Sequence, residues 1–505
     1  MTFIRFSLHA YFAPVFSLVL CCATSIGHAA ESDAQSGFVM RNNASLRLGL
    51  ERLTLPGDEK MGMLGTTYLI EVAPHVYMGP AAYSSVTGQR GGFYTVGGEL
   101  EWRQKLVSNI SLEAGAYVGG GGGGSSLVGG GLMLRPHADL MWDFGGYRAG
   151  ISASNVRFPN GHVHSNQIGL VVDFDTHFLH TGFGYTDQDV PVNGRTGVGF
   201  DRAIAFFGAY KPSKSATLLS GAPLQNSIGY VGTRMERMIT PHFFVGLEAA
   251  GANTGGVAGY AEFLGTAGAE MPLLDNRLTV GTRVALGTGG GGSVSVGGGV
   301  LVKAGVYATA NLTRNFHISV EGGVADSPQG NFRATYETLG LHWNLDHPYS
   351  AGAPSKLVAN EWVAGTQHYI KAARKDGTVQ NMDVFTLKLN RYVTESLYLT
   401  GQAHSAYAGQ AGGYSVGLIG AGYRTSRSYS GWYAGAELLA GAAGGGSVDT
   451  SGGIVVQPLM YAGVGLSKSI SARLSAGRII SQKGELNSNV VELGLSYAFG
   501  TTRRE

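Results

Sequence analysis

Residues 433–441 read Tyr-Ala-Gly-Ala-Glu-Leu-Leu-Ala-Gly, and residues 460–467 read Met-Tyr-Ala-Gly-Val-Gly-Leu-Ser. In both stretches apolar side chains alternate with glycine, alanine, serine or a charged residue, and residues 472–479 repeat the pattern. A period of two indicates β-strands with one apolar face. Small and polar side chains on the other face are typical of a barrel that has lipid outside and a polar lumen. The sequence therefore predicts an all-β fold.

The composition agrees with this fold class. The chain has 81 glycines, 24 tyrosines and 21 phenylalanines, and only 14% of its residues are charged. There is no Gly-X-Y period, which excludes collagen, and the many aromatic residues argue against a disordered chain. No apolar run beyond the N-terminus is long enough for a membrane helix. The formal net charge of +2 gives no indication of nucleic-acid binding.

The N-terminus has the pattern of a signal peptide. Arg5 and His9 precede the apolar run 12–26, and Gly27-His-Ala29 supplies small residues at the positions that a signal peptidase reads. We therefore expect residues 1–29 to be removed on export. Cys21 and Cys22 are the only cysteines and lie inside this segment, and Leu20 before them argues against lipidation. The mature chain then has no disulfide and no thiolate metal site.

Three glycine-rich stretches, each between two apolar strands, indicate an internal repeat. They cover residues 116–131, 286–299 and 440–453. Two other anchors recur at nearly the same spacings: the tripeptides Ile168-Gly-Leu, Leu339-Gly-Leu and Leu493-Gly-Leu, and the segments 73–79, 240–246 and 396–401. This agreement predicts three copies of one unit, which we place at residues 30–190, 191–345 and 346–505.

Each unit is expected to contain about eight strands, which gives one large antiparallel transmembrane barrel of roughly 24 strands. Longer loops fit at Asp187–Arg195, Lys211–Asn226 and Asp346–Lys356, and the last two are expected between the units. Three small barrels in tandem are an alternative, but the short linkers favour a single closed sheet. A β-solenoid is disfavoured because its repeats span only about 20–50 residues.

The signal peptide, the alternating strands and the terminal strand Val490-Val-Glu-Leu-Gly-Leu-Ser-Tyr-Ala-Phe499 together resemble Gram-negative outer-membrane β-barrels as a broad class. The resemblance implies localisation in the outer membrane, contact with its lipid and lipopolysaccharide, and insertion by the barrel-assembly machinery. In that class the closing strand usually ends the chain on an aromatic residue. Here six residues follow Phe499, which is a departure from the class pattern.

The glycine-rich stretches are expected to be long hairpins in which missing side chains allow close backbone approach. None has the Gly-Lys-Ser/Thr ending of a phosphate-binding loop. The hairpins are marked by Gly119, Gly131, Gly289, Gly299, Gly444 and Gly453. The alternative is an aperture or a contact site, because three symmetric glycine tips could line one rim.

Polar residues flank these hairpins at what look like equivalent positions: Glu113, Arg283 and Glu437 before the glycines, and Arg135, Lys303 and Gln457 after them. We expect the two sets to face each other in a water-filled lumen and to form a belt of charge. One interpretation is that these charges are simply solvated in the lumen or form structural ion pairs. The other, functional interpretation is that they form a charged constriction that selects solutes. In a wet lumen, loss of one partner should cost only about 1 kcal/mol or less.

Few other residues suggest chemistry. In His162-Val-His-Ser-Asn166, His164 directly precedes Ser165, so in a strand the two side chains point to opposite faces and catalysis is not expected. His75 and His242 each follow a proline and are expected in turns rather than as metal ligands. The five tryptophans suit membrane-interface girdles. They are Trp102, Trp142, Trp343, Trp362 and Trp432.

A wide barrel without a plug predicts a channel or a translocation conduit for solutes, a polymer or a secreted partner protein. The alternative is a structural or surface-binding barrel that transports nothing. No enzymatic activity, metal or cofactor is expected from these residues, and the sequence names no solute or partner.

Overall fold

The computed structural model describes residues 39–192, 194–349, 355–425 and 431–504. The expected signal peptide lies outside these residues. The described chain is built of antiparallel strands and turns. No helix within these ranges is long and apolar enough to cross a membrane.

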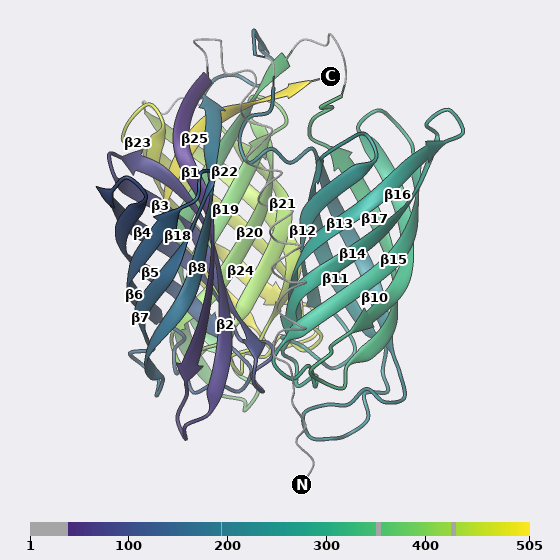
Figure 1. The fold of residues 1–505 in the computed structure, drawn as a ribbon. Helices are drawn as coiled ribbons and strands as arrows, with labels where there is room; N and C mark the ends of the chain where they lie inside the picture. Colours follow the sequence, from purple (N-terminus) through teal and green to yellow (C-terminus); the bar gives the residue numbers. More distant parts are fainter. Residues whose placement is uncertain (1–38, 193, 350–354, 426–430, 505) are drawn as a thin grey trace.

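The strands form three groups of eight, with one short strand between the first two groups (Figure 1). The first group is β1 (Val39–Thr54), β2 (Lys60–Ala73), β3 (Val76–Thr87), β4 (Tyr94–Val107), β5 (Ile110–Gly122), β6 (Met133–Asp143), β7 (Tyr147–Arg157) and β8 (His164–Thr181). The short strand is β9 (Asp189–Val190). The second group is β10 (Arg202–Pro212), β11 (Ile228–Met238), β12 (Phe243–Ala252), β13 (Ala261–Leu273), β14 (Leu278–Gly290), β15 (Val300–Asn311), β16 (Phe316–Asp326) and β17 (Arg333–Asn344). The third group is β18 (Ser355–Ala373), β19 (Val379–Tyr392), β20 (Leu397–Ala408), β21 (Ser415–Arg424), β22 (Trp432–Gly444), β23 (Ile454–Gly465), β24 (Ile470–Ser481) and β25 (Asn487–Arg504).

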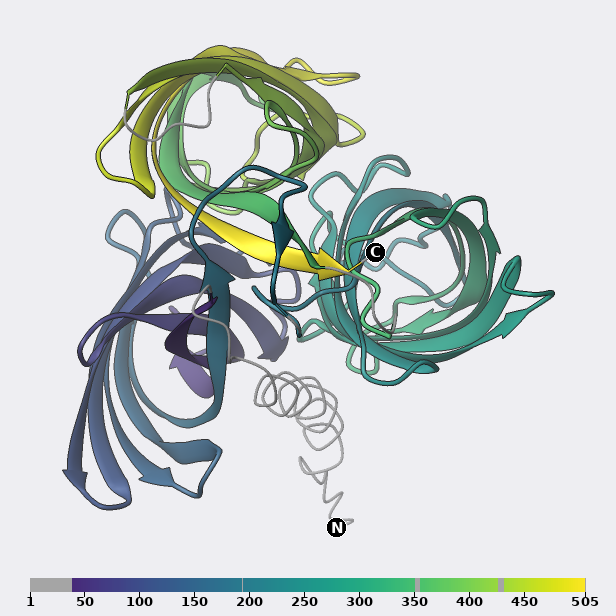
Figure 2. The same ribbon diagram turned by 90° about the horizontal axis from the view of Figure 1, so that it is seen from above.

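Each group closes on itself as a barrel. The first strand of a group pairs with the last: β1 with β8, β10 with β17 and β18 with β25. Seen from above, the three barrels lie side by side around a common centre (Figure 2). We call them barrels 1, 2 and 3.

The antiparallel all-β fold and the approximate strand number are confirmed, but the single large barrel is corrected to three small barrels in tandem. Closing each group pairs every strand edge within that group, so no edge has to find a partner in the next group. The connections are also long enough to keep the groups separate, because residues 182–201 and 345–354 lie between them. The expected unit boundaries fall in these two connections.

One expected loop position is also corrected. The segment Lys211–Asn226 does not separate two units but joins β10 to β11 within barrel 2. The shared origin of the three units stays a prediction, although the glycine-rich segment joins the fifth to the sixth strand in every barrel.

The strands alternate between a buried inner face and an apolar outer face. In β17, Leu339 and Leu341 point outward and are more than half exposed, whereas Thr338 and His342 point inward and are buried. The outward residues are large and apolar on most strands, as a lipid-facing surface requires. Trp102, Trp142 and Trp432 are exposed on this surface and Trp343 is partly exposed, all near the end at which the chain enters and leaves each barrel.

The two ends of the barrels differ. At the terminal end, where the chain enters and leaves each barrel, most turns within a barrel are short, as at residues 74–75 and 108–109. The connection 182–201 also lies there, and β9 pairs with the start of β18 while Gly500 pairs with Thr181, which ties barrel 1 to barrel 3. The other end, which we call the loop end, carries the longer loops and all three glycine-rich segments. In outer-membrane barrels the long loops are extracellular and the short turns periplasmic.

Candidate functional site: barrel interiors and glycine junctions

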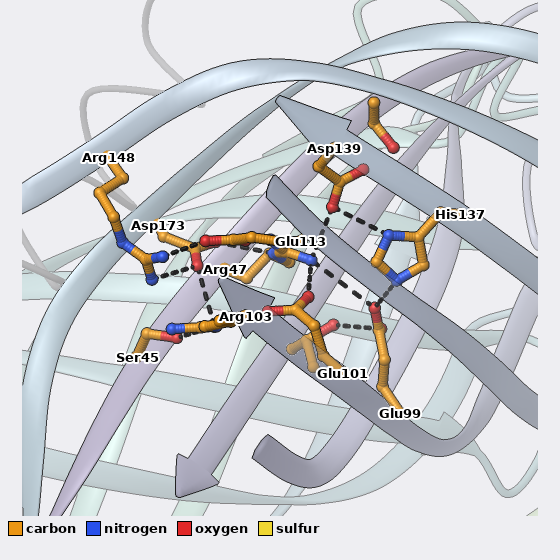
Figure 3. A network of polar contacts seen from close by, with 12 residues as sticks. Ser45, Arg47, Glu99, Glu101, Arg103, Glu113, His137, Asp139, Arg148 and Asp173 are labelled. Atoms are coloured by element: carbon orange, nitrogen blue, oxygen red, sulfur yellow. Dashed lines mark hydrogen bonds and ion pairs between the residues drawn. The ribbon is translucent and has the colours of Figure 1, made fainter. Parts of the chain in front are cut away.

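The interior of barrel 1 is organised around Arg47 of β1 (Figure 3). Its guanidinium lies 2.7 Å from Asp173 Oδ1 and 3.0 Å from Asp139 Oδ2, and it also contacts Glu101 and Glu113. Glu113 is on β5, the strand opposite β1 in a barrel of eight, so this ion pair spans the whole lumen. Arg47 is only 5% exposed.

Further charges surround this centre. Arg103 and Arg148 both reach Asp173, with distances of 3.0 and 2.8 Å to its Oδ2. His137 lies 2.9 Å from Asp139 through Nδ1 and 2.8 Å from Glu99 through Nε2. His137 therefore bridges two carboxylates of the network (Figure 3).

Glu99, Glu101 and His137 bring three potential metal-ligand atoms within 4.8 Å of one another. However, Arg47 already contacts Glu101. It also contacts Asp139, which lies on the other side of His137. An arginine and a metal cation would compete for these oxygens. We therefore describe the group as a buried ion-pair network, without assigning a cofactor.

Barrel 2 contains a second network that also joins distant strands. Lys303 of β15 lies 2.7 Å from Glu248 Oε1 and 2.9 Å from Glu262 Oε1. Arg283 of β14 lies 2.6 Å from Glu236 Oε1 on β11, three strands away. All five side chains are buried.

Barrel 3 contains a network with the same character. Glu437 of β22 accepts hydrogen bonds from Arg473 at 2.9 Å and from Tyr398 at 2.8 Å. Lys388 of β19 lies 2.7 Å from Glu492 and 3.4 Å from Glu437, so it joins β22 to β25 through the lumen. Each barrel thus has buried ion pairs that cross its interior.

The six residues expected to form a lumen belt all lie inside the barrels, where each is at most 4% exposed. Their partners differ from the expected ones. Glu113 pairs with Arg47 and Arg148, Arg135 with Glu51, and Gln457 with Gln367. The register explains this, because Glu113 lies opposite Asp139 rather than Arg135. Glu113 is also not equivalent to Arg283 and Glu437. Counted in inward-facing residues, it lies one position farther from the glycine-rich segment of its own barrel than they do from theirs.

The expectation of a water-filled lumen is also corrected. An eight-stranded barrel is just wide enough for its own side chains to fill, whereas the expected barrel of roughly 24 strands would be wide. The residues that sequence reasoning missed are the partners on other strands, among them Arg47, Glu248 and Glu492. Their signal was present: Arg47 and Glu51 are four residues apart, so they lie on the same face of one strand.

The glycine-rich segments are long hairpins, as expected. Gly131 and Gly299 have φ of +98° and +107°, and their carbonyls accept hydrogen bonds from Gly121 and Gly289 at 3.1 and 2.7 Å. Gly453, at φ +93°, accepts one from Ala443 at 2.8 Å. Gly119 lies near the end of β5, and Gly444 is the last residue of β22.

These hairpins also form the contacts between barrels. The fifth strand of each barrel approaches the third strand of a neighbour: β5 approaches β20, β14 approaches β3, and β22 approaches β12. Each barrel therefore gives one such contact and receives one, and the three contacts close a ring (Figure 2). We call them the glycine junctions.

Backbone meets backbone at the glycine junctions. Gly412 of barrel 3 donates to the Gly129 carbonyl at 2.9 Å, and Gly91 of barrel 1 donates to the Gly297 carbonyl at 2.8 Å. A Cβ on Gly92 would come within 2.1 Å of the Gly291 nitrogen. At the third junction a Cβ on Gly444 would come within 2.3 Å of the Gly259 nitrogen. Only glycine permits this approach.

The remaining candidates have structural places. Ser165 points inward and accepts a hydrogen bond from the Thr54 amide at 2.9 Å, while His164 points outward and is exposed. His75 has φ +67° in the turn between β2 and β3, and His242 lies in the turn before β12. Trp362 is an exception among the tryptophans, because it packs on Phe178 and Phe499 between barrels 1 and 3.

No family model matches the sequence, and no curated protein matches it. Solved structures of outer-membrane proteins are found at low similarity. OccAB3 of Acinetobacter baumannii is 10% identical, covering 91% of this chain and 99% of that one, with a TM-score of 0.22. The outer membrane protein opdK of Pseudomonas aeruginosa is 9% identical over 91% and 98%, also at 0.22. The copper transporter OprC is 9% identical over 93% and 81%, at 0.28.

These scores are too low to carry an argument, so the assignment depends on the chain itself. The strands are antiparallel and close into barrels, their outer faces are apolar, exposed tryptophans gather near one end, and charges lie inside. These are the features of a transmembrane barrel. The described chain therefore has the architecture of a transmembrane β-barrel protein.

Proposed function

We propose that the protein is a non-transporting scaffold of the outer membrane, which holds three closed barrels as one body and presents their loops outside the cell. This is the second of the two functions expected from the sequence. The observation that supports it best is the set of ion pairs across each lumen. Arg47, Lys303 and Glu437 are each at most 5% exposed, so side chains fill the centre of each of the three barrels.

The glycine junctions support the same proposal. They join each barrel to both of its neighbours, so the loops at the loop end are held together as one surface. The loop that joins β10 to β11 is also fixed, since the Leu219 amide donates to the Ser293 carbonyl at 2.8 Å and the Ser295 amide donates to Thr217 at 3.1 Å. Loops fixed in this way form a surface suited to binding.

Catalysis is not part of the proposal. The His-Asp and His-Glu contacts of barrel 1 are buried and form part of an ion-pair network. No substrate reaches them without opening the barrel. Insertion by the barrel-assembly machinery is proposed from the closing strand β25, which carries Tyr497 and Phe499 near its end.

Conductance in planar bilayers tests the proposal. We expect the purified wild-type protein to give no reproducible current steps. The comparison is a variant with Lys388, Glu437 and Arg473 all changed to Ala, because these truncations remove the network that fills barrel 3. If the variant assembles, it should give small steps.

Reproducible steps from the wild type that change in size in the triple variant would support the channel function and contradict the scaffold. Steps of the same size in both proteins would come from another pathway or from a contaminant. Protein lacking the closing strand β25 serves as that control.

A further inference from the structure

The outer face of barrel 1 carries a group of basic residues at the loop end. Arg52 lies near the end of β1, Lys60 begins β2, Arg157 ends β7 and His164 begins β8. All four side chains point outward and are exposed. We call these four residues the cationic patch.

The residues of the cationic patch lie on four neighbouring strands. Arg157 pairs in register with His164, and Lys60 pairs with Thr54 at the end of β1. The β1 end is held against β8 by the hydrogen bond from the Thr54 amide to Ser165 Oγ at 2.9 Å. Adjacent strands are about 4.8 Å apart, so the charged groups can reach a common ligand of roughly 10–15 Å width.

The patch differs from the outer face of barrel 2. There, outward charges near the loop end are paired: Lys211 lies 3.0 Å from Glu337 and Arg333 lies 3.0 Å from Asp326. In barrel 3, His368 lies 2.6 Å from Asp383, whereas Lys371 and Arg478 are exposed and form no ion pair among the described residues. Within the described ranges, Arg52, Lys60 and Arg157 form no ion pair. Lys60 donates only to Thr54 Oγ1, at 2.6 Å.

An apolar surface begins directly below the patch on the same strands. Ile168 and Leu170 of β8 are 75% and 64% exposed, and Ile151 of β7 is 50% exposed. Along β8 the outward residues therefore change from His164 to Ile168 within four positions. Such a change marks the boundary between acyl chains and headgroups.

We propose that the cationic patch binds the phosphate groups of an anionic lipid of the outer leaflet, a bisphosphorylated lipid A. The guanidinium groups of Arg52 and Arg157 match phosphate in charge and geometry, and Lys60 adds a third cation. The acyl chains of the same molecule cover Ile151, Ile168 and Leu170. The site depends on the outer-membrane location and on the orientation of the loop end, and it is independent of whether the lumens are closed.

The test compares two triple variants in nanodiscs of phosphatidylcholine. The first is Arg52→Gln, Lys60→Gln and Arg157→Gln; the matched control is Lys211→Gln, Arg333→Gln and Arg478→Gln, which removes the same charge from the outer faces of barrels 2 and 3. The probe is bisphosphorylated lipid A, and native mass spectrometry measures the bound fraction. Each basic residue near a membrane surface contributes about 1 kcal/mol, roughly fivefold, so we expect the first variant to lose at least tenfold in affinity.

The control variant should bind as the wild type does. Equal binding by wild type and first variant overturns the proposal, and so does an equal loss in both variants. Displacement of the lipid by millimolar inorganic phosphate would overturn the lipid as the ligand, because it would show that acyl chains add nothing. If the first triple variant shows no heat-modifiable folded band, the single variant Arg157→Gln replaces it. A loss of about threefold or more in affinity for lipid A then supports the site, and unchanged affinity overturns it.

Discussion

Neutralising Glu437 tests whether the barrel interiors are dry. Glu437→Gln keeps the size of the side chain and a carbonyl acceptor but removes the charge that faces Arg473 at 2.9 Å and Lys388 at 3.4 Å. Among the residues that the structure describes, Glu492 then remains as the only carboxylate paired with both cations, 2.7 Å from Lys388 and 3.8 Å from Arg473. Breaking a buried ion pair costs about 3–5 kcal/mol, and the remaining contacts place this variant near 3 kcal/mol.

The control is Glu337→Gln, which breaks an ion pair with Lys211 on the outer surface. Both of its side chains are about 60% exposed, so the expected cost is below roughly 0.5 kcal/mol. Unfolding is followed by the fluorescence of Trp432, which lies on the same strand as Glu437, after the other four tryptophans are changed to Phe. If Glu437→Gln lowers the stability no more than Glu337→Gln does, the lumen of barrel 3 is hydrated and the argument for closed barrels fails.

Three more predictions concern other parts of the molecule. Gly92→Val should separate barrel 1 from barrel 2 and make the connection 182–201 more sensitive to protease. The control Gly57→Val has a similar φ of +80° but open space around it, so it should not have this effect. Equal proteolysis of the two variants would contradict the role of the glycine junctions. Glu113→Lys should prevent folding of barrel 1, seen as loss of the heat-modifiable band, because it places a third cation beside Arg47 and Arg148. Burial raises the pKa of Asp201, in the connection before β10, to about 6, so folding favours the protonated carboxyl. The contribution of Asp201 to the free energy of unfolding should therefore fall as the pH rises from about 4 to about 6. Asp201→Asn should abolish this part of the pH dependence of unfolding.

Much of the fold follows from the alternation of side chains, because a period of two assigns each residue to the inner or the outer face. The interior positions of Glu113, Arg283 and Gln457 could be predicted in this way. Their partners could not, since a cross-lumen contact depends on how many strands close the barrel. A closed sheet of roughly 24 strands and three sheets of eight have the same local pattern, and the choice is made by the pairing of β1 with β8, which are distant in sequence.

The glycines show the same limit. Gly119 and Gly131 mark a hairpin in any reading of the sequence, because the segment between them has few side chains. The contact of that hairpin with Gly412 and Gly413 is invisible from the sequence, since it joins barrel 1 to barrel 3. The contact had only one sequence signal: more glycine than a turn of this length requires.

The ring of glycine junctions has a consequence for the order of assembly. The junction between Gly129 and Gly412 joins the first barrel to the last, so it cannot form until β18 and the strands that follow it have been inserted. Until then, barrels 1 and 2 share only one junction, and barrel 3 does not yet cover the glycine segment of barrel 1. Completion of the third barrel is therefore the event that locks the first, and a chain truncated after β17 would reach the membrane as a hinged pair rather than as a smaller version of the whole.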